Sequence, residues 1–220
     1  MTAILLFIVI AVVGSYWWLW RHRITEKPWA TVGVTVDHED SSRFLPPGKI
    51  GLLFFLAVVT SLFALFVSAY FIRMGLADWI PQKEPGLLWF NTFMLVLGSV
   101  AIQWASYSAD HNDPKTTRYA LLATGLFTGA FIVGQLWAWQ GLVDQGLYMY
   151  SNPSLAFFYL FTGVHGLHII GGLWVWCRTT LHAWSGAQMF EIRLSVELCK
   201  TYWHYLLLIW IGIFGLLLST

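Results

Sequence analysis

The fold is decided by residues 157–176, which read FFYLFTGVHGLHIIGGLWVW. The run around them, from Ser154 to Cys177, contains no Asp, Glu, Lys or Arg. As a helix that rises about 1.5 Å per residue, it is long enough to cross a hydrocarbon layer of about 30 Å. His165 and His168 lie near its middle, and their spacing puts both side chains on one side of the helix. Because polar groups at that depth are costly unless protein or a cavity receives them, we expect this side to be buried and hydrogen-bonded.

The composition is that of an integral membrane protein. Of the 220 residues, 58% are apolar and 10% are charged, whereas a soluble domain has about 25% charged residues. The net charge of +1 and the absence of a basic run give no indication of nucleic-acid binding. Tryptophans such as Trp79, Trp104 and Trp203 lie near the ends of apolar runs, where the membrane–water boundary favours them. Cys177 and Cys199 form no metal or redox motif, and we expect them to be packing residues.

Six apolar runs predict six membrane-spanning helices. They cover about residues 2–20, 50–72, 87–107, 119–143, 154–177 and 195–219. Arg21 and Arg23 follow the first run instead of preceding it, which favours a retained anchor over a signal peptide. We therefore expect an all-α membrane protein in three parts. These are an N-terminal anchor at 1–20, a polar connector at 21–49 and a five-helix domain at 50–220.

The connector and its charges predict the orientation of the chain. Pro46 and Pro47 should break any helix before the second span. The acidic cluster at 37–40 lacks the regular spacing of metal ligands, so it is typical of a solvated loop. The connectors after the first, third and fifth spans hold ten of the twelve Lys and Arg residues. They are Arg21, Arg23, Lys27, Arg43, Lys49, Lys115, Arg118, Arg178, Arg193 and Lys200. Because basic loops stay in the cytoplasm, both termini are predicted to be periplasmic in a bacterial inner membrane.

Two blocks of the sequence resemble subunit III of the haem-copper terminal oxidases. TGVHGLHIIGG at 162–172 is similar to the penultimate helix of that family, and ELCKTYWHYLLLIW at 197–210 is similar to its last helix. The resemblance implies a cofactor-free membrane subunit that packs beside the catalytic subunit of a cytochrome c or quinol oxidase. It also implies phospholipid in a cleft between helix groups.

The sequence departs from the pattern of this family at three intramembrane acids. The matching positions hold Val59, Ala138 and Leu207. Gln135 of a family Gln-x-x-Glu motif is present, and the pair Asn91–Thr92 resembles a family Asn-Thr pair. By physical chemistry alone, Asn91, Thr92 and Gln135 are candidates for hydrogen bonds between helices.

Polar side chains on the last two spans form the candidate site. The cluster consists of His165, His168, Arg178, Arg193, Glu197, Lys200 and His204. Glu197, Lys200 and His204 share a helix face, and Glu197 precedes Lys200 in the order that favours an ion pair. From their similar depths we expect His168 and His204 to meet between the two spans, with Glu197 above them.

Three interpretations of this cluster remain open. The first is hydrogen bonding that fixes how the last two helices pack. The second is a lipid site, with Arg178, Arg193 and Lys200 at the mouth of a gap that holds anionic head groups. The third is metal or haem ligation, which normally needs more histidines on facing helices than the spans contain.

The functional hypothesis is an accessory subunit of a respiratory oxidase. By resemblance, the complex reduces O2 with electrons from cytochrome c or quinol and translocates protons, with haem and copper in partner subunits I and II. Phospholipid, and a larger respiratory supercomplex through the extra helix, are further predicted partners. The alternatives are a subunit-III-like partner of nitric oxide reductase and a stand-alone transporter or haem-binding enzyme. Transport by this chain alone is disfavoured because its first five spans contain no acidic residue.

Overall fold

The computed structural model describes residues 46–81, 85–186 and 188–219. They form the helices α2 (Pro47–Met74), α3 (Leu87–Asp110), α4 (Pro114–Asp144), α5 (Pro153–Trp184) and α6 (Met189–Leu218). Each helix is long and apolar enough to cross a membrane, and these ranges contain no strand. The all-helical prediction is therefore confirmed for the last five spans. The predicted anchor at 2–20, the connector as far as residue 45 and the acidic cluster at 37–40 lie outside the described residues.

The helices begin where the sequence supplies proline and a capping side chain. Pro47, Pro114 and Pro153 are the first residues of α2, α4 and α5. Proline suits this position because its missing N–H would have no partner there and its φ already matches the helix. Asp113 accepts two backbone hydrogen bonds of 3.1 Å at the start of α4, and Asn152 accepts one of 3.0 Å at the start of α5. The helices consequently extend beyond the apolar runs.

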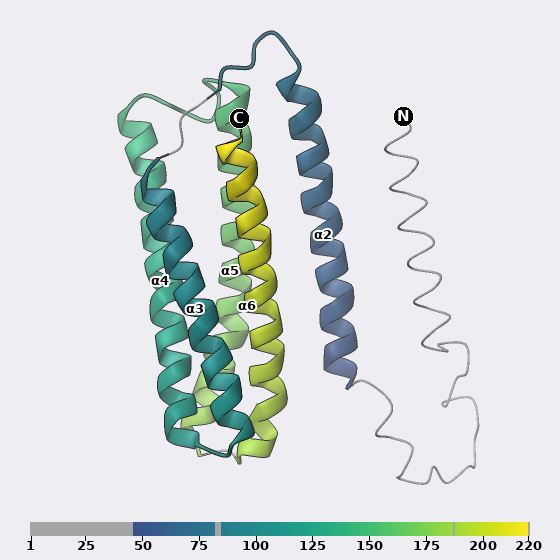
Figure 1. Ribbon diagram of the computed structural model, residues 1–220, viewed down its shortest axis with the longest axis vertical. Coiled ribbons are helices and arrows are strands. Elements are labelled where there is room, and N and C mark those ends of the chain that lie inside the picture. Colours follow the sequence, from purple (N-terminus) through teal and green to yellow (C-terminus); the bar gives the residue numbers. More distant parts are fainter. Residues whose placement is uncertain (1–45, 82–84, 187, 220) are drawn as a thin grey trace, which may run out of the picture. The chain divides into compact units, whose positions relative to one another are not determined.

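The five helices pack side by side, with α2 at the edge of the group (Figure 1). The helices α3 and α4 are antiparallel neighbours joined by a turn at 111–113, while α6 lies against α3 and α5. The helix α2 packs on α5 and α6. Only 17% of its most apolar window is buried, against 33–39% in the other four helices. Most of this window of α2 is therefore exposed within the described part of the chain.

Buried and partly buried tryptophans tie the helices together. The indole donors and their acceptors are Trp139 to Thr162 Oγ1 at 3.0 Å, Trp176 to the Leu121 carbonyl at 3.0 Å, Trp203 to Thr128 Oγ1 at 3.1 Å and Trp210 to Thr92 Oγ1 at 2.9 Å. Each bond joins two different helices. The prediction that Trp203 lies at the membrane boundary is wrong, because position 203 lies well inside the candidate span 192–218 and its indole is bonded to Thr128 near the middle of α4.

Two glycines allow neighbouring side chains to approach the helix backbones. A Cβ at Gly125 of α4 would lie 2.3 Å from atoms of the Trp176 ring. A Cβ at Gly172 of α5 would lie 2.6 Å from Cε1 of Tyr202. Both contacts are shorter than a carbon–carbon contact permits, so the absence of a side chain is what brings α5 close to α4 and α6.

Candidate functional site

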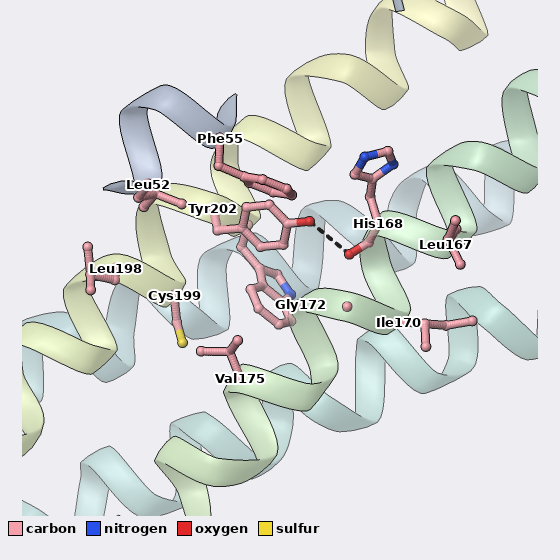
Figure 2. A pocket seen from close by; sticks show the side chains of 12 residues that line it. Leu52, Phe55, Leu167, His168, Ile170, Gly172, Val175, Leu198, Cys199 and Tyr202 are labelled. Atoms are coloured by element: carbon pink, nitrogen blue, oxygen red, sulfur yellow. Dashed lines mark hydrogen bonds between the residues drawn. The ribbon is translucent and has the colours of Figure 1, made fainter. Parts of the chain in front are cut away.

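An apolar pocket of about 620 Å³ lies between α2, α5 and α6. Figure 2 shows its walls, and we call it the α2/α5/α6 pocket. It is lined by Leu52 and Phe55 of α2, by Leu167, His168, Ile170, Gly171, Gly172 and Val175 of α5, and by Leu198, Cys199, Tyr202 and Trp203 of α6. Nearly all of these side chains are apolar, so the pocket suits a hydrocarbon chain better than a polar ligand.

The polar atoms of His168 and Tyr202 are used to hold the wall of the pocket together. The Tyr202 hydroxyl donates a hydrogen bond of 2.9 Å to the backbone carbonyl of His168 (Figure 2). His168 Nδ1 lies 2.7 Å from the Val164 carbonyl, and since a carbonyl only accepts, Nδ1 carries the proton. The imidazole lies beside the rings of Phe55 and Phe63, with centroids 6.3 and 5.7 Å away. His168 therefore faces α2.

A second, more polar pocket continues from the first along α5. It has a volume of about 650 Å³ and is lined by Val175, Arg178, Thr179, Leu181, His182, Ser185 and Ser195. Val175 lines both pockets, so an apolar surface near the middle of α5 leads to a polar one near its end. Arg178, one of the basic residues predicted at a lipid site, lines this second pocket.

His165 is packed between aromatic rings in the centre of the bundle. Its side chain is fully buried, with the ring centroid of Trp210 at 5.1 Å and that of Phe131 at 5.9 Å. The prediction of hydrogen bonding is wrong for this residue, because neither ring nitrogen has a partner among the described residues. Ring packing is what joins His165 to α4 and α6.

His204 lies on a different side of α6 and does not meet His168. Its Nδ1 is hydrogen-bonded to Ser99 Oγ, and its Nε2 lies 3.0 Å from Gln103 Oε1. The prediction that the two histidines meet is therefore wrong, since His168 faces α2 whereas His204 is bonded to α3. The depth of a residue along its helix does not tell which neighbouring helix its side chain faces, because the rotation of each helix about its axis is set by packing against the other helices.

Glu197 is paired with a helix that the sequence did not suggest. Its Oε1 lies 2.6 Å from Lys49 Nζ, at the start of α2. The predicted partner was Lys200, three residues further along α6, and this prediction is also wrong. The ion pair fastens the beginning of α2 to α6.

Arg193 and Arg118 hold helix ends together at one end of the bundle, where the turn at 111–113 joins α3 to α4. Arg193 donates to the carbonyl of Ala109 at 3.0 Å and to that of Asp110 at 2.8 Å. Arg118 Nε donates to the Ala183 carbonyl at 2.8 Å. Arg193 is thus engaged with helix ends and does not line the pocket that contains Arg178.

Asn91, Thr92 and Gln135 are placed between helices. Asn91 Nδ2 donates to Gln135 Oε1 at 3.2 Å, which joins α3 to α4. Thr92 accepts from the Trp210 indole of α6. Both bonds lie in the interior, where no water competes for the donors.

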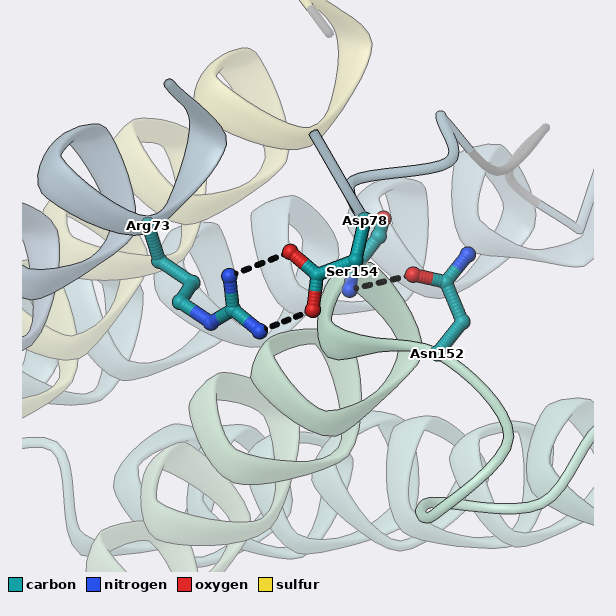
Figure 3. A network of polar contacts seen from close by, with 4 residues as sticks. All are labelled: Arg73, Asp78, Asn152 and Ser154. Carbon is teal, nitrogen blue, oxygen red and sulfur yellow. Dashed lines mark hydrogen bonds and ion pairs between the residues drawn. The ribbon is translucent and has the colours of Figure 1, made fainter. Parts of the chain in front are cut away.

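A polar network closes the opposite end of the bundle (Figure 3). Both guanidinium nitrogens of Arg73 bond to the Asp78 carboxylate, one of them at 2.6 Å. These bonds hold the pKa of the Asp78 carboxyl below its ordinary value. Asn152 caps α5 through Ser154 and donates to the Ile80 carbonyl at 2.7 Å. The loop after α2 is thereby attached to the start of α5.

The described residues contain no metal centre. Among residues 46–81, 85–186 and 188–219, no three His, Cys, Asp or Glu side chains are grouped so that they could hold a metal ion.

Comparisons with known proteins find relatives that share one name. No protein-family model matches the chain. A protein of Nocardia farcinica named "Probable cytochrome c oxidase subunit 3" is 29% identical over 176 residues, which cover 76% of this chain and 85% of the relative. These relatives support a member of the cytochrome c oxidase subunit III family. A protein of the same name from Mycobacterium leprae is 29% identical over 174 residues, covering 76% and 84% of the two chains. Cytochrome c oxidase subunit 3 of Thermostichus vulcanus is 28% identical over 194 residues, covering 84% and 92%. The resemblance found at 162–172 and 197–210 is thus confirmed.

Within this subunit III pattern, the positions of the three absent acids lie in the bundle. Val59 and Ala138 are 2% and 4% exposed, and Leu207 is partly buried. Apolar side chains at these positions remove charges that would otherwise need partners inside the membrane. The departure from the family pattern is therefore compatible with the packing.

Sequence reasoning missed several residues that hold the site. Lys49 is predicted only as a basic residue of the connector, although it is the ion-pair partner of Glu197. Ser99 and Gln103 bond to His204, and their spacing of four residues on α3 was a signal that could have been noticed. Tyr202 had no such signal, because its role depends on the approach of α5 to α6.

Proposed function

We propose that this chain is a non-catalytic, accessory subunit of a haem-copper oxidase. The complex reduces O2 with electrons from cytochrome c or quinol and translocates protons, and haem and copper belong to its catalytic subunits. The names of the relatives support this proposal, together with five helices that can cross a membrane. The proposed location is the bacterial cytoplasmic membrane, with subunits I and II as neighbours.

The proposed work of the chain is to stabilise the catalytic subunit. Its helices are joined by indole hydrogen bonds, an ion pair and aromatic packing, so they can present a fixed surface to a partner. A preorganised surface loses little conformational freedom on association, which favours a stable complex.

We also propose that the α2/α5/α6 pocket holds one acyl chain of a phospholipid. The pocket is apolar and its continuation along α5 carries Arg178, so a head-group phosphate has a cation close to the end of the acyl-chain surface. This arrangement combines the hydrophobic and charged contacts that a phospholipid needs.

Purification tests the main proposal. An affinity tag on this chain in mild detergent should recover a haem-copper catalytic subunit, with the spectrum of haem a or o and with copper. Recovery of a partner with haem b and non-haem iron would favour a nitric oxide reductase. If the purified chain alone bound haem or transported an ion, both of these functions would be contradicted.

The lipid proposal has its own test in two glycines of α5. Gly171 lines the α2/α5/α6 pocket and Gly166 does not, and a Cβ at either position meets no atom within 4 Å. Gly171→Phe should therefore fill the pocket and lower the phospholipid that copurifies with the complex, measured by mass spectrometry. Gly166→Phe is the matched control and should retain the lipid. Equal lipid content in both variants would exclude the pocket as the binding site.

A further inference from the structure

The side of α6 that faces away from the bundle has a regular pattern. Its residues lie at alternating intervals of four and three and are exposed or partly exposed. They are Glu197, Thr201, His204, Leu208, Ile211 and Gly215, and we call this surface the α6 outer face. A repeat of four and three residues is the pattern by which one helix packs along another at a crossing angle of about 20°.

The α6 outer face lies between α3 and α2, which contact α6 on its two sides (Figure 1). On one side, His204 is bonded to Ser99 and Gln103 of α3. On the other, the Tyr205 hydroxyl lies 2.9 Å from Thr60 Oγ1 of α2. The face between these contacts is not covered by another helix within the described part of the chain.

Polar atoms are exposed on this face at the depth of the hydrocarbon. Residue 204 lies near the midpoint of the candidate span 192–218, and its side chain is exposed. Gln103 Oε1 can only accept, so His204 Nε2 donates to it and His204 Nδ1 accepts from the Ser99 hydroxyl. The one donor and the one acceptor of the imidazole are then both used.

The Gln103 amide nitrogen remains as a donor without an acceptor among residues 46–81, 85–186 and 188–219. Gln103 is exposed, and lipid tails offer no hydrogen-bond acceptor. A lipid cover would therefore leave two N–H groups unpaired, whereas a protein helix with an acceptor would satisfy them.

The far half of the same face has room for a partner. A Cβ added at Gly215 on this face, or at Gly212 directly beside the face, meets no atom within 4 Å, and both residues are exposed. Small residues on a membrane helix let another helix approach closely, so polar atoms near the middle and glycines beyond them lie on one continuous contact surface.

We propose that the α6 outer face seats one membrane-spanning helix of the catalytic subunit, and that this helix presents a hydrogen-bond acceptor to Gln103 Nε2. The proposal rests on the proposed function, because it takes a haem-copper catalytic subunit as the partner. The partner helix would complement this surface in two ways: it would accept a hydrogen bond near the middle of α6, and it would pack closely beside the two glycines.

Photo-cross-linking in native membranes tests this placement. A benzophenone amino acid at position 208 replaces a leucine that is 66% exposed on the α6 outer face, and the control at position 126 replaces a leucine that is 71% exposed on α4. We expect position 208 to give a severalfold higher yield of adduct with the catalytic subunit than position 126. An adduct only with lipid or with a second copy of this chain would overturn the proposal.

A pair of glycine variants gives an independent readout. Gly215→Phe adds bulk to the α6 outer face, and Gly129→Phe adds the same bulk on α4, where a Cβ also meets no atom within 4 Å. We expect a severalfold loss of catalytic subunit from the tagged complex with Gly215→Phe and no loss with Gly129→Phe. The melting temperature of each isolated subunit should stay unchanged, which separates lost docking from misfolding.

A third variant isolates the hydrogen bond. Gln103→Glu keeps an oxygen that accepts from His204 Nε2 and removes the amide N–H groups, so it should lower retention of the catalytic subunit during washing in detergent while the bond between α3 and α6 is kept. If the wild-type chain recovers no haem-copper subunit, the proposed function fails. If it recovers one while Gly129→Phe and position 126 give the stronger effects, only the docking surface is wrong.

Discussion

At the scale of the residue, Trp210 shows how one side chain can join four helices. It belongs to α6, donates to Thr92 of α3, and packs against Phe131 of α4 and His165 of α5. Its side chain is fully buried. Since the indole supplies both a large apolar surface and one hydrogen-bond donor, it satisfies a polar group in the interior while it fills the core.

A double-mutant cycle measures this hydrogen bond. Trp210→Phe removes the donor and Thr92→Val removes the acceptor, and each should lower the stability of the subunit. The double variant should be more stable than the sum of the two losses predicts, with a coupling of about 0.5–1.5 kcal/mol. Thermal unfolding in detergent provides the measurement. Trp174→Phe, at an indole that is 79% exposed, should have little effect.

Gly125 permits a contact that a larger residue would destroy. Gly125→Ala places a Cβ 2.3 Å from the Trp176 ring, so the indole must move and its bond of 3.0 Å to Leu121 is strained. We expect a loss of about 1–3 kcal/mol in unfolding free energy, as for other overpacked interiors. Gly129→Ala, about one turn along the same helix, should be neutral or slightly stabilising. Equal effects of the two variants would contradict the close approach of Trp176.

At the scale of the element, α4 depends on its N-terminal cap. The Asp113 carboxylate accepts from the Thr116 hydroxyl at 2.5 Å and from the backbone amides of Lys115 and Thr116 at 3.1 Å. The bond from the Thr116 side chain is the main reason that the pKa of this carboxyl lies below its ordinary value of 3.8, and the backbone bonds add to it. The cap lies outside the apolar run, where it can exchange protons with water.

The lowered pKa predicts how stability varies with pH. Because the folded state binds this proton more weakly than the unfolded state, the cap contributes fully above the ordinary pKa and is lost as the pH falls through the lower folded-state value. Asp113→Asn keeps a capping oxygen but cannot titrate there. The melting temperature of the wild type should therefore fall more than that of Asp113→Asn when the pH is lowered from 7 to below 3.8. Identical pH profiles would show that the carboxylate has no such role.

The helix α2 shows how a strongly apolar element can be weakly attached. Tyr70 is its main buried anchor, with ring centroids of Trp79 and Phe157 at 4.9 and 5.4 Å. Lys49 provides a second attachment through Glu197 at the other end of the helix. Between these attachments much of α2 is exposed, which leaves the α2/α5/α6 pocket open to a lipid chain.

At the scale of the whole molecule, the basic residues gather at one end of the bundle. Lys49, Lys115 and Arg193 belong to the end where α2, α4 and α6 begin, and Arg73 belongs to the opposite end. Basic residues mark the cytoplasmic side of a membrane protein, so this end is predicted to face the cytoplasm.

Cysteine labelling in intact cells tests the orientation. In a background without Cys177 and Cys199, Tyr150→Cys should react with a membrane-impermeant thiol reagent, because residue 150 is 85% exposed at the end predicted to be periplasmic. Lys115→Cys, which is exposed at the other end, should react only after the membrane is permeabilised. The opposite pattern would mean that the chain has the reverse topology.

The sequence by itself predicted the five described helices and the resemblance to subunit III. Runs such as 154–177 are too apolar and too long for anything but membrane-spanning helices, because an unpaired backbone cannot remain in hydrocarbon. Pro114 and Asp113 likewise marked a helix start through purely local chemistry. The motif at 162–172 carried the family through residues that stand side by side in the chain.

Only the tertiary structure decided which side chains meet. His168 faces α2, His204 bonds to α3 and Glu197 pairs with Lys49, although sequence spacing suggested that all three belong to one cluster. Depth in the membrane follows from counting residues, but the rotation of each helix about its axis follows from the summed packing of its neighbours. Contacts such as Gly172 against Tyr202 set that rotation, and they join residues that the chain keeps far apart.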